Sequence, residues 1–449
     1  MARPAVTNTL RDAARSRRGT VPPTRALAAA AAAALALTGC LGPAGSARVS
    51  SADASGDGTL RIGLLLDNTG PQNFLNAPQL AAAKLAVKDI NDAGGHKGKP
   101  VELLPETVSA DTAAQAKALV GAKADVVIGP TDSSRAPAAI DVLANAKVAV
   151  ISPANSAAAL SNYKSGGYYF RTAAADVAQA PVLAKLAKDG GAKTLAVLHE
   201  EGDYGKGVGA AVAAAATQSG LETVAQAEFK PGQAQQAVAD VKAANPDAVV
   251  LVAREGAQGA IAELNNAGLA GKKLVLSDGA VSQYGSGLGA RALEGARGVL
   301  PGVFPSAEFQ ADLVAVDPGL KDMIFAAETY DAVTLAGIAA AAAEDDAGTS
   351  IAASLVGVSG GISAAGGQSA GQSAGQSAGP SAAEVCTSYK ACTDALRAGR
   401  RPDYDGQSGR INFDAHGDIT QANYVVYTYG ADNQAKMTGT ETAGSSGGG

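Results

Sequence analysis

The sequence predicts an α/β protein made of two doubly wound parallel-sheet lobes that are joined by a multi-strand hinge. The first observation is a regular alternation of short apolar runs with helical segments, which is typical of a parallel sheet covered on both faces by helices. The second is that this alternation runs twice, from residue 60 to about 170 and from about 177 to 276. The third is that the joins at 168–172 and 298–305 are short, which favours a hinge over independent domains.

The first series begins with the apolar run 60–66, which predicts a buried strand that ends in a turn. A helix is expected at 79–91, because apolar residues recur there with helical spacing and Gly94-Gly95 follows. Further strands are expected at 101–105, 125–130 and 148–153, with helices at 112–122 and 134–145. The second series predicts helices at 177–188, 205–218, 234–244 and 257–266, and strands at 194–199, 222–229, 248–253 and 273–276.

These elements divide the chain into two lobes and several smaller segments. Lobe 1 is expected at 59–171, with 305–345 returning to it, and lobe 2 at 172–304, with about 410–430 returning to it. The other expected segments are a signal peptide at 1–39, a flexible tether at 40–58, a low-complexity insertion at 346–384, a small Cys-loop segment at 385–408 and a disordered tail at 431–449. The insertion contains a repeated Ala-Gly-Gln-Ser unit, a composition that buries too little apolar surface to offset the entropy of ordering.

The leader ends in a cysteine. An alanine- and leucine-rich run from Ala26 closes with Leu37-Thr38-Gly39-Cys40, and six arginines precede it. The run is shorter than the roughly 20 residues that a spanning helix needs. Its end resembles the lipobox of bacterial lipoproteins, so we expect lipidation at Cys40 and an extracytoplasmic chain anchored to the cell membrane. The alternative is an ordinary secretory signal with an incidental cysteine.

The composition excludes some partners. The formal net charge is −6, and the first 39 residues hold six arginines and one aspartate, so the remainder is more acidic than the whole chain. Such a chain is a poor partner for nucleic acid. Hydrophobic residues make up 47% of the sequence, as in a globular protein with a core. Apart from Cys40, the cysteines are Cys386 and Cys392, which predict one disulfide; a metal site is the alternative, although no histidine is near.

Several loops are candidates for binding a small molecule, because ligands of open parallel sheets gather beyond the carboxyl ends of the strands. Four loops rich in small polar residues fall there, at 68–75, 129–135, 152–156 and 200–205. Hydroxyls such as those of Ser133 and Ser156 at helix starts suit a small anion, but they also suit plain helix caps. Asp278 follows a strand and could receive an ammonium group or simply form an Asp-Gly turn. Tyr204 could line a cleft or be a surface aromatic.

Catalytic chemistry has little support in the sequence. No serine lies in a nucleophile-elbow pattern, and no Walker-type loop is present. The three histidines, His96, His199 and His416, occur in unrelated contexts, and His199 lacks the spacing of a helical zinc motif. We therefore expect no enzyme activity, no cofactor and no metal.

Seven segments carry a family resemblance when they are taken in order. They are Leu60–Leu66, Gly129–Ser134, Val150–Leu160, Phe170–Thr172, His199–Gly205, Thr329–Val333 and Gly409–Asp418. Together they resemble the type I periplasmic binding proteins, specifically the branched-chain amino acid (Leu/Ile/Val) binding family of ABC transporters. The resemblance covers about residues 60–429 and is interrupted by the insertion.

The resemblance implies roles for particular residues. Ser133 and Ser156 match the residues that hold the ligand's α-carboxylate, with the Ser156 N–H assisting. The Ala154 carbonyl and the Asp278 carboxylate match the groups that receive the α-ammonium. Donors on one side and a carboxylate on the other are what a zwitterion needs once closure has removed its water.

The resemblance also implies a pocket and a mode of action. Tyr204 matches the aromatic of the closing lobe, and Phe74 or Leu75 falls where an aromatic caps the side-chain pocket. The implied protein is an extracytoplasmic, lipid-anchored monomer that captures a small amino-acid-like ligand by hinge closure and delivers it to an ABC permease. A ligand sensor of the same fold and an extracytoplasmic hydrolase are the alternatives.

Two places depart from the family pattern. Asp132 adds a negative charge beside the expected carboxylate site. Arg254 and Glu255 occupy a strand end where the family more often has an uncharged or aromatic residue. If they face the cleft, the ligand could carry a polar or charged side chain.

Overall fold

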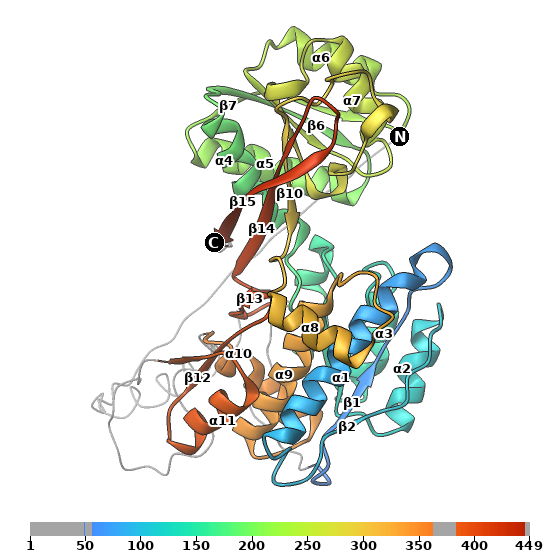
Figure 1. The fold of residues 1–449 in the computed structure, drawn as a ribbon, viewed down its shortest axis with the longest axis vertical. Helices are drawn as coiled ribbons and strands as arrows, with labels where there is room; N and C mark the ends of the chain where they lie inside the picture. Colours follow the sequence, from blue (N-terminus) through green and yellow to red (C-terminus); the bar gives the residue numbers. More distant parts are fainter. Residues whose placement is uncertain (1–48, 50–55, 362–382, 445–449) are drawn as a thin grey trace, which may run out of the picture. The chain divides into compact units, whose positions relative to one another are not determined.

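The computed structural model describes residue 49 and residues 56–361 and 383–444 (Figure 1). It contains two large sheets with helices on both faces and a third, small sheet. The predicted α/β class with two doubly wound lobes is therefore confirmed. The leader, Cys40, most of the tether and the Ala-Gly-Gln-Ser repeats lie outside the described residues.

The first sheet has five parallel strands in the order β2-β1-β3-β4-β5. They are β1 (Arg61–Leu64), β2 (Glu102–Leu103), β3 (Val126–Ile128), β4 (Ala149–Ser152) and β5 (Tyr169–Arg171). The strands are packed on one side by α2 (Thr112–Gly121) and α3 (Ala136–Asn145), and on the other by α1 (Asn76–Asp92), α8 (Ala307–Val316), α9 (Ala326–Ala343) and α10 (Gly348–Val358).

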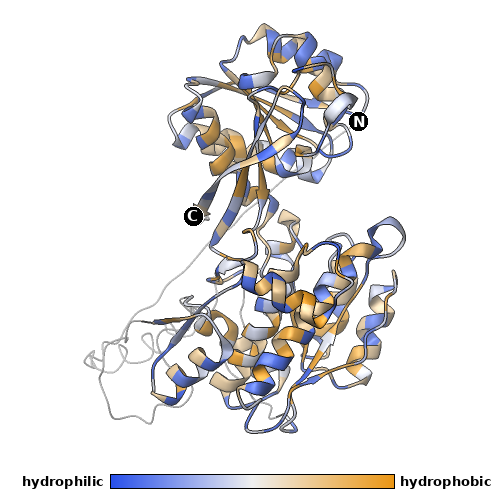
Figure 2. Ribbon diagram, viewed as in Figure 1, coloured by the Kyte–Doolittle hydropathy of each residue, from blue (hydrophilic) through white to orange (hydrophobic). Residues whose placement is uncertain are grey.

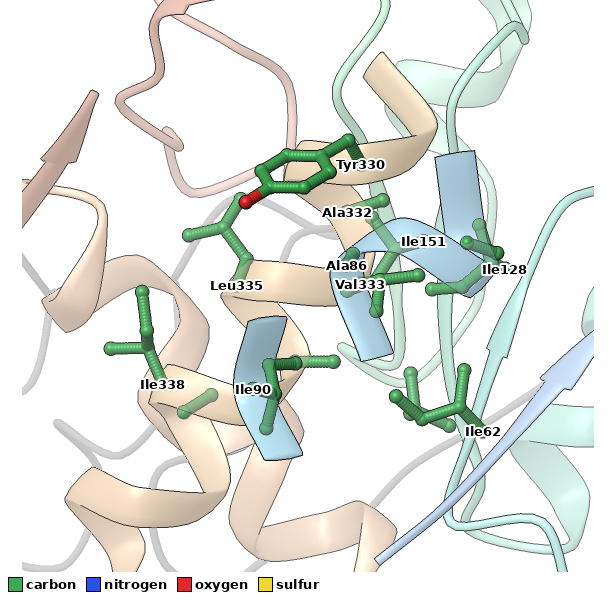
Figure 3. Close-up of a cluster of buried hydrophobic side chains, with 14 of the residues drawn as sticks. Ile62, Ala86, Ile90, Ile128, Ile151, Tyr330, Ala332, Val333, Leu335 and Ile338 are labelled. Carbon is green, nitrogen blue, oxygen red and sulfur yellow. The ribbon is translucent and has the colours of Figure 1, made fainter. Parts of the chain in front are cut away.

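Alternation along the strands explains why this sheet has two cores. In β3, Val126 and Ile128 enter the core with α1 and α9, whereas Val127 enters the core with α2 and α3. Figure 3 shows the first of these cores, where Ile62, Ile128 and Ile151 lie with side chains from α1 and α9. Hydrophobic residues also occur along strands of both large sheets (Figure 2).

The second sheet has seven strands in the order β15-β14-β10-β9-β8-β6-β7. They are β6 (Thr194–Glu200), β7 (Glu222–Phe229), β8 (Ala248–Val252), β9 (Leu274–Leu276), β10 (Arg297–Pro301), β14 (Gln421–Tyr429) and β15 (Ala435–Gly444). Strands β6 to β10 are parallel, and β14 and β15 join antiparallel. Helices α4 (Ala180–Asp189) and α5 (Asp203–Gln218) cover one face, and α6 (Gln235–Ala243) and α7 (Ala257–Asn266) the other.

The prediction of a disordered tail at 431–449 is wrong for residues 435–444. They form β15, which pairs with β14 along its whole length. The segment carries several threonines, whose branched side chains favour strands, and β14 supplies the hydrogen-bonding partner. Asn433 holds the preceding turn, because its amide accepts from the Leu293 N–H at 3.0 Å and donates to the Gly289 carbonyl at 2.9 Å.

The prediction of a low-complexity insertion at 346–384 is wrong for residues 348–358, which form α10. Ile351, Leu355 and Val358 recur at helical spacing and are buried in the core with α9. Small residues let this helix pack closely: a side chain at Gly348 would lie 2.3 Å from the Lys147 carbonyl oxygen. The expectation rested on composition, and the small residues of this helix resemble those of the repeats that follow it.

A small three-stranded sheet follows the undescribed segment and carries the disulfide between Cys386 and Cys392. Its elements are β11 (Glu384–Cys386), α11 (Tyr389–Arg397), β12 (Pro402–Gly406) and β13 (Gly409–Arg410). Both cysteines are buried against the core of the first lobe. The disulfide therefore holds α11 to the edge of β11 beside that core.

Asp331, in the segment Thr329–Val333, has a structural role. Its fully buried carboxylate accepts from the Tyr404 hydroxyl at 2.7 Å, from the Gln407 N–H at 2.8 Å, and from the Ser408 N–H and hydroxyl at 2.7 and 2.6 Å. A carboxylate with this many donors tolerates burial without a cation. Asp331 thereby ties α9 to the turn between β12 and β13.

We expect His96 to make the first lobe less stable in acid. Its side chain is 1% exposed and neither ring nitrogen has a hydrogen-bond partner among the described residues, so burial lowers the imidazole pKa. The unfolded chain then binds the proton more readily, and the stabilisation is complete above a pH of about 6.5 and is lost as the pH falls through that value. The loss approaches about 1.4 kcal/mol per pH unit.

The measurement is the urea unfolding free energy at about pH 7.5 and about pH 5.5 for the native chain and for His96→Leu. The decrease between these conditions should be smaller in the variant, which has no titrating group at this position. Parallel pH profiles for the two proteins would contradict the expectation.

Candidate functional site

The loops after β3 and β4 bring Ser133 and Ser156 together. The Ser133 hydroxyl accepts from the Ser156 N–H at 3.1 Å and from the Ala157 N–H at 3.3 Å. Ala154 lies in the same loop and is 8% exposed. The loop is held from below by Ser152, whose hydroxyl accepts from the Asn155 N–H at 2.9 Å. Three of the predicted site residues therefore share one compact set of backbone and hydroxyl groups.

Asp67 fixes the loop after β3 from the neighbouring strand. Its buried carboxylate accepts from the Thr131 N–H at 2.8 Å and from the Asp132 N–H at 3.1 Å, and burial raises its pKa above the ordinary value. Gly129 allows the close approach that this requires, since a side chain there would lie 2.6 Å from the Leu65 carbonyl oxygen. Sequence reasoning treated Asp67 only as a turn residue.

The extra charge of Asp132 is compensated locally. Its carboxylate lies 3.3 Å from the Arg135 Nε and accepts from the Ser134 N–H and hydroxyl at 2.8 and 2.7 Å. These partners are on the following turn, which leads into α3. The negative charge that departs from the family pattern at this position is thus paired within its own loop.

Asp278 and Tyr204 meet at the carboxyl ends of the second sheet. The Tyr204 hydroxyl donates to the Asp278 carboxylate, and burial followed by the charge of Asp278 raises the tyrosine pKa well above its ordinary value. Gln179 completes the group: its amide donates to the Asp278 carboxylate at 2.7 Å and accepts from the Asp278 N–H at 3.0 Å. Asp278 is half-buried, and its carboxylate is held in place by the donors of Tyr204 and Gln179.

Asp176 and Arg254 connect these two sets. The Asp176 N–H donates to the Ser156 carbonyl at 2.7 Å, and the Asp176 carboxylate lies 3.4 Å from Nη2 of Arg254. The Arg254 guanidinium lies 3.9 Å from the centroid of the Tyr204 ring. Burial, and then the charge of Asp278, raise the pKa of Asp176. A continuous chain of contacts therefore runs from the serine pair to the tyrosine–aspartate pair.

Asp176 and Gln179 were missed by sequence reasoning. They lie in a short 3₁₀ turn (Asp176–Gln179) just before α4, where the sequence predicted only the start of a helix. The signal that could have found them is two polar residues in the first turn after a short join between the lobes. Pro181 is the second residue of α4, a position in the first turn of a helix that proline fits well.

Phe74 is not brought into this chain of contacts. It lies in a 3₁₀ turn (Gly70–Leu75) before α1 and is 49% exposed, and none of the contacts described above involves it. Its neighbour Leu75 is half-buried. The expectation that one of them caps the side-chain pocket stays a prediction.

The described residues offer little for metal chemistry or membrane spanning. Within 56–361 and 383–444, no three His, Cys, Asp or Glu side chains are grouped so as to hold a metal ion. In the same part of the chain, no helix is both long enough and apolar enough to cross a bilayer. The His199 Nδ1 lies 3.3 Å from the Glu200 carbonyl oxygen, a contact with the backbone.

The comparison with known families agrees with this fold. Residues 59–383, more than half of the chain, match the family model described as periplasmic binding protein. The chain therefore belongs to the periplasmic binding protein family.

Individual relatives confirm the resemblance to the branched-chain amino acid branch of the family. The chain is 32% identical over 170 residues to the leucine-, isoleucine-, valine-, threonine- and alanine-binding protein of Pseudomonas aeruginosa, an alignment that covers 36% of this chain and 45% of the relative. The chain thus spans about half the length of the curated relatives that it matches.

Solved structures share the fold at low identity. One is the branched-chain amino acid substrate-binding protein LivJ of Streptococcus pneumoniae in complex with isoleucine, with a TM-score of 0.55, 21% identity, and coverage of 86% of this chain and 99% of that one. Another is an ABC transporter solute-binding protein of Rhodopseudomonas palustris in complex with p-hydroxybenzoic acid, with a TM-score of 0.58, 16% identity, and coverage of 86% and 98%. The same fold therefore holds chemically different ligands.

Proposed function

We propose that this chain is an extracytoplasmic solute-binding protein that captures a small amino-acid-like ligand between its two lobes and delivers it to an ABC permease. The observation that carries the proposal is the continuous chain of contacts from Ser133 and Ser156 through Asp176 and Arg254 to Tyr204 and Asp278. The names of the relatives, which are binding proteins and not enzymes, support it.

The proposed roles follow from the charges of a zwitterion. Donors of the two loops that carry Ser133 and Ser156 receive the α-carboxylate, and the half-buried Asp278 carboxylate receives the α-ammonium. The Ala154 carbonyl accepts a second ammonium proton, and Tyr204 positions the Asp278 carboxylate. The ligand bridges both lobes, so its differential affinity for the closed state drives hinge closure.

Thermal unfolding of the full-length protein against a panel of amino acids and related small solutes tests this proposal. A ligand present at 1,000 times its Kd adds roughly 4 kcal/mol of stability. We expect a clear upward shift with one class of amino acid and no shift with simple sugars. The absence of a shift with every amino acid would contradict the proposed ligand and leave the fold unaffected.

Lipid anchoring through Cys40 is part of the proposal and rests on the apolar run 26–40. We expect the native chain to enter the detergent phase in a Triton X-114 extraction of expressing cells, because lipidation buries acyl chains at about 0.8 kcal/mol for each CH₂. The Cys40→Ala variant should lose this partitioning. A variant that still enters the detergent phase would show that some other feature holds the protein there.

A further inference from the structure

Arg254 is fixed at the carboxyl end of the second sheet by its backbone. Its N–H donates to the Glu200 carboxylate at 2.7 Å, and the Gly256 N–H donates to the same oxygen at 3.1 Å. Glu200 is 9% exposed and ends the neighbouring strand β6. The Glu200 carboxylate therefore binds backbone N–H groups and positions Arg254 in the loop that follows β8.

The Arg254 side chain lies on Tyr204, which the family resemblance matches to the aromatic residue of the closing lobe. Its guanidinium covers the Tyr204 ring at 3.9 Å from the centroid, and the side chain is 52% exposed. Nη2 donates to the Asp176 carboxylate at 3.4 Å, a longer distance than a strong charged pair makes. Among the described residues, Nε and Nη1 have no hydrogen-bond acceptor.

This placement changes what a ligand side chain meets. A bare tyrosine ring offers an apolar surface, which suits the side chain of leucine or isoleucine. Here one face of the ring carries a cation with unused donors. An aliphatic group packed against it would remove water from those donors without replacing the hydrogen bonds, whereas a carboxylate or carboxamide oxygen would accept from them.

We propose that Arg254 is the specificity-determining residue of this site and selects amino acids whose side chain ends in a carboxylate or carboxamide oxygen over leucine, isoleucine and valine. The inference rests on the proposed function and goes beyond it by naming the ligand class. Asp176 holds the guanidinium over the Tyr204 ring, and the free Nε and Nη1 donate to the ligand side chain.

Titration calorimetry with the full-length protein tests this inference. The ligands are aspartate, glutamate, asparagine, glutamine, leucine and isoleucine, so that the acid and amide arms separate the two oxygen sources. The native chain should bind the best oxygen-bearing ligand at least about tenfold more tightly than leucine or isoleucine. Arg254→Met keeps the length of the stem and removes the donors, so the preference should disappear.

Two further variants keep the result interpretable. Arg291→Met removes an arginine whose side chain is 66% exposed and which pairs with Glu294, so it should leave the preference intact. If Arg254→Met does not fold, Arg254→Lys, which retains the charge and loses the planar fork, should weaken the preference without abolishing it.

The outcomes separate this inference from the proposed function. Tightest binding of leucine or isoleucine by the native chain, or an unchanged preference in the Arg254 variants, would overturn the inference and leave the solute-binding function in place. The absence of binding for all six amino acids would overturn the inference, whereas the proposed ligand class itself fails only if no amino acid of the thermal panel shifts the unfolding temperature.

Discussion

Replacing Asp278 by asparagine should weaken ligand binding by about 30- to 4,000-fold, because the loss of one partner from a desolvated charge pair costs about 2–5 kcal/mol. Asparagine keeps the shape of the side chain and an oxygen that can accept from Gln179 and Tyr204. It removes only the negative charge that the α-ammonium requires. The ligand-free protein should unfold at nearly the native temperature, since Asp278 is a like-charge neighbour of Asp176.

The measurement is the Kd of the tightest ligand from the thermal panel for the native chain, Asp278→Asn and Asp240→Asn. Asp240 lies on α6 and contacts Gln236, so its variant removes an equivalent charge far from the ligand groups and should bind normally. Binding by Asp278→Asn within a factor of three of the native chain would show that the ammonium is received elsewhere.

Replacing Arg171 by methionine should destabilise the protein by about 3–5 kcal/mol, the usual cost of removing one partner of a buried ion pair. Arg171 is fully buried, and its Nε and Nη2 donate to the two Asp418 carboxylate oxygens at 2.7 and 2.9 Å. Nη1 donates to the Ala157 carbonyl at 2.9 Å, and Nη2 also donates to the Ser161 hydroxyl at 2.7 Å. The Arg171 side chain thus holds three segments together: the end of β5, the segment 157–161 and the turn at 414–418.

The urea unfolding free energy measures this effect. Arg397→Met is the matched control, because Arg397 pairs with Asp394 at the surface, where ion pairs contribute about 0–1 kcal/mol. Adding Asp418→Leu to Arg171→Met should recover part of the loss, since it removes the carboxylate left without its guanidinium. A loss below about 1 kcal/mol in the single variant would contradict a structural role for the pair.

The fold was predictable because its signals are local and repeated. The run 248–253 is apolar throughout, and the run 60–66 is apolar apart from Arg61. Such runs are typical of strands buried on both faces, and each is followed by a helical pattern. The elements that were missed lack such signals. The helix at 348–358 is rich in small residues, and the strand at 435–444 depends on pairing with β14, which sequence spacing does not show.

The candidate site was predictable in part for a similar reason. Ser133, Ser156 and Asp278 lie in loops that follow the carboxyl ends of strands, so the rule for open parallel sheets finds them. Asp176 was not found, because its contact with Arg254 joins residues 78 positions apart. Such a pair depends on the path of the chain between the two sheets. The connecting segment is short and has no sequence motif that indicates this path.

The most direct test of the central claim is to titrate the full-length protein with its tightest amino acid and with the α-deaminated and α-decarboxylated analogues of that ligand. In the proposed site, the loops that carry Ser133 and Ser156 hold the α-carboxylate and Asp278 holds the α-ammonium. We therefore expect each analogue to bind at least about 30-fold more weakly than the intact amino acid, because each leaves one half-buried polar set without its partner. Equal binding of either analogue would contradict recognition of a zwitterion and would assign the site to a different class of solute.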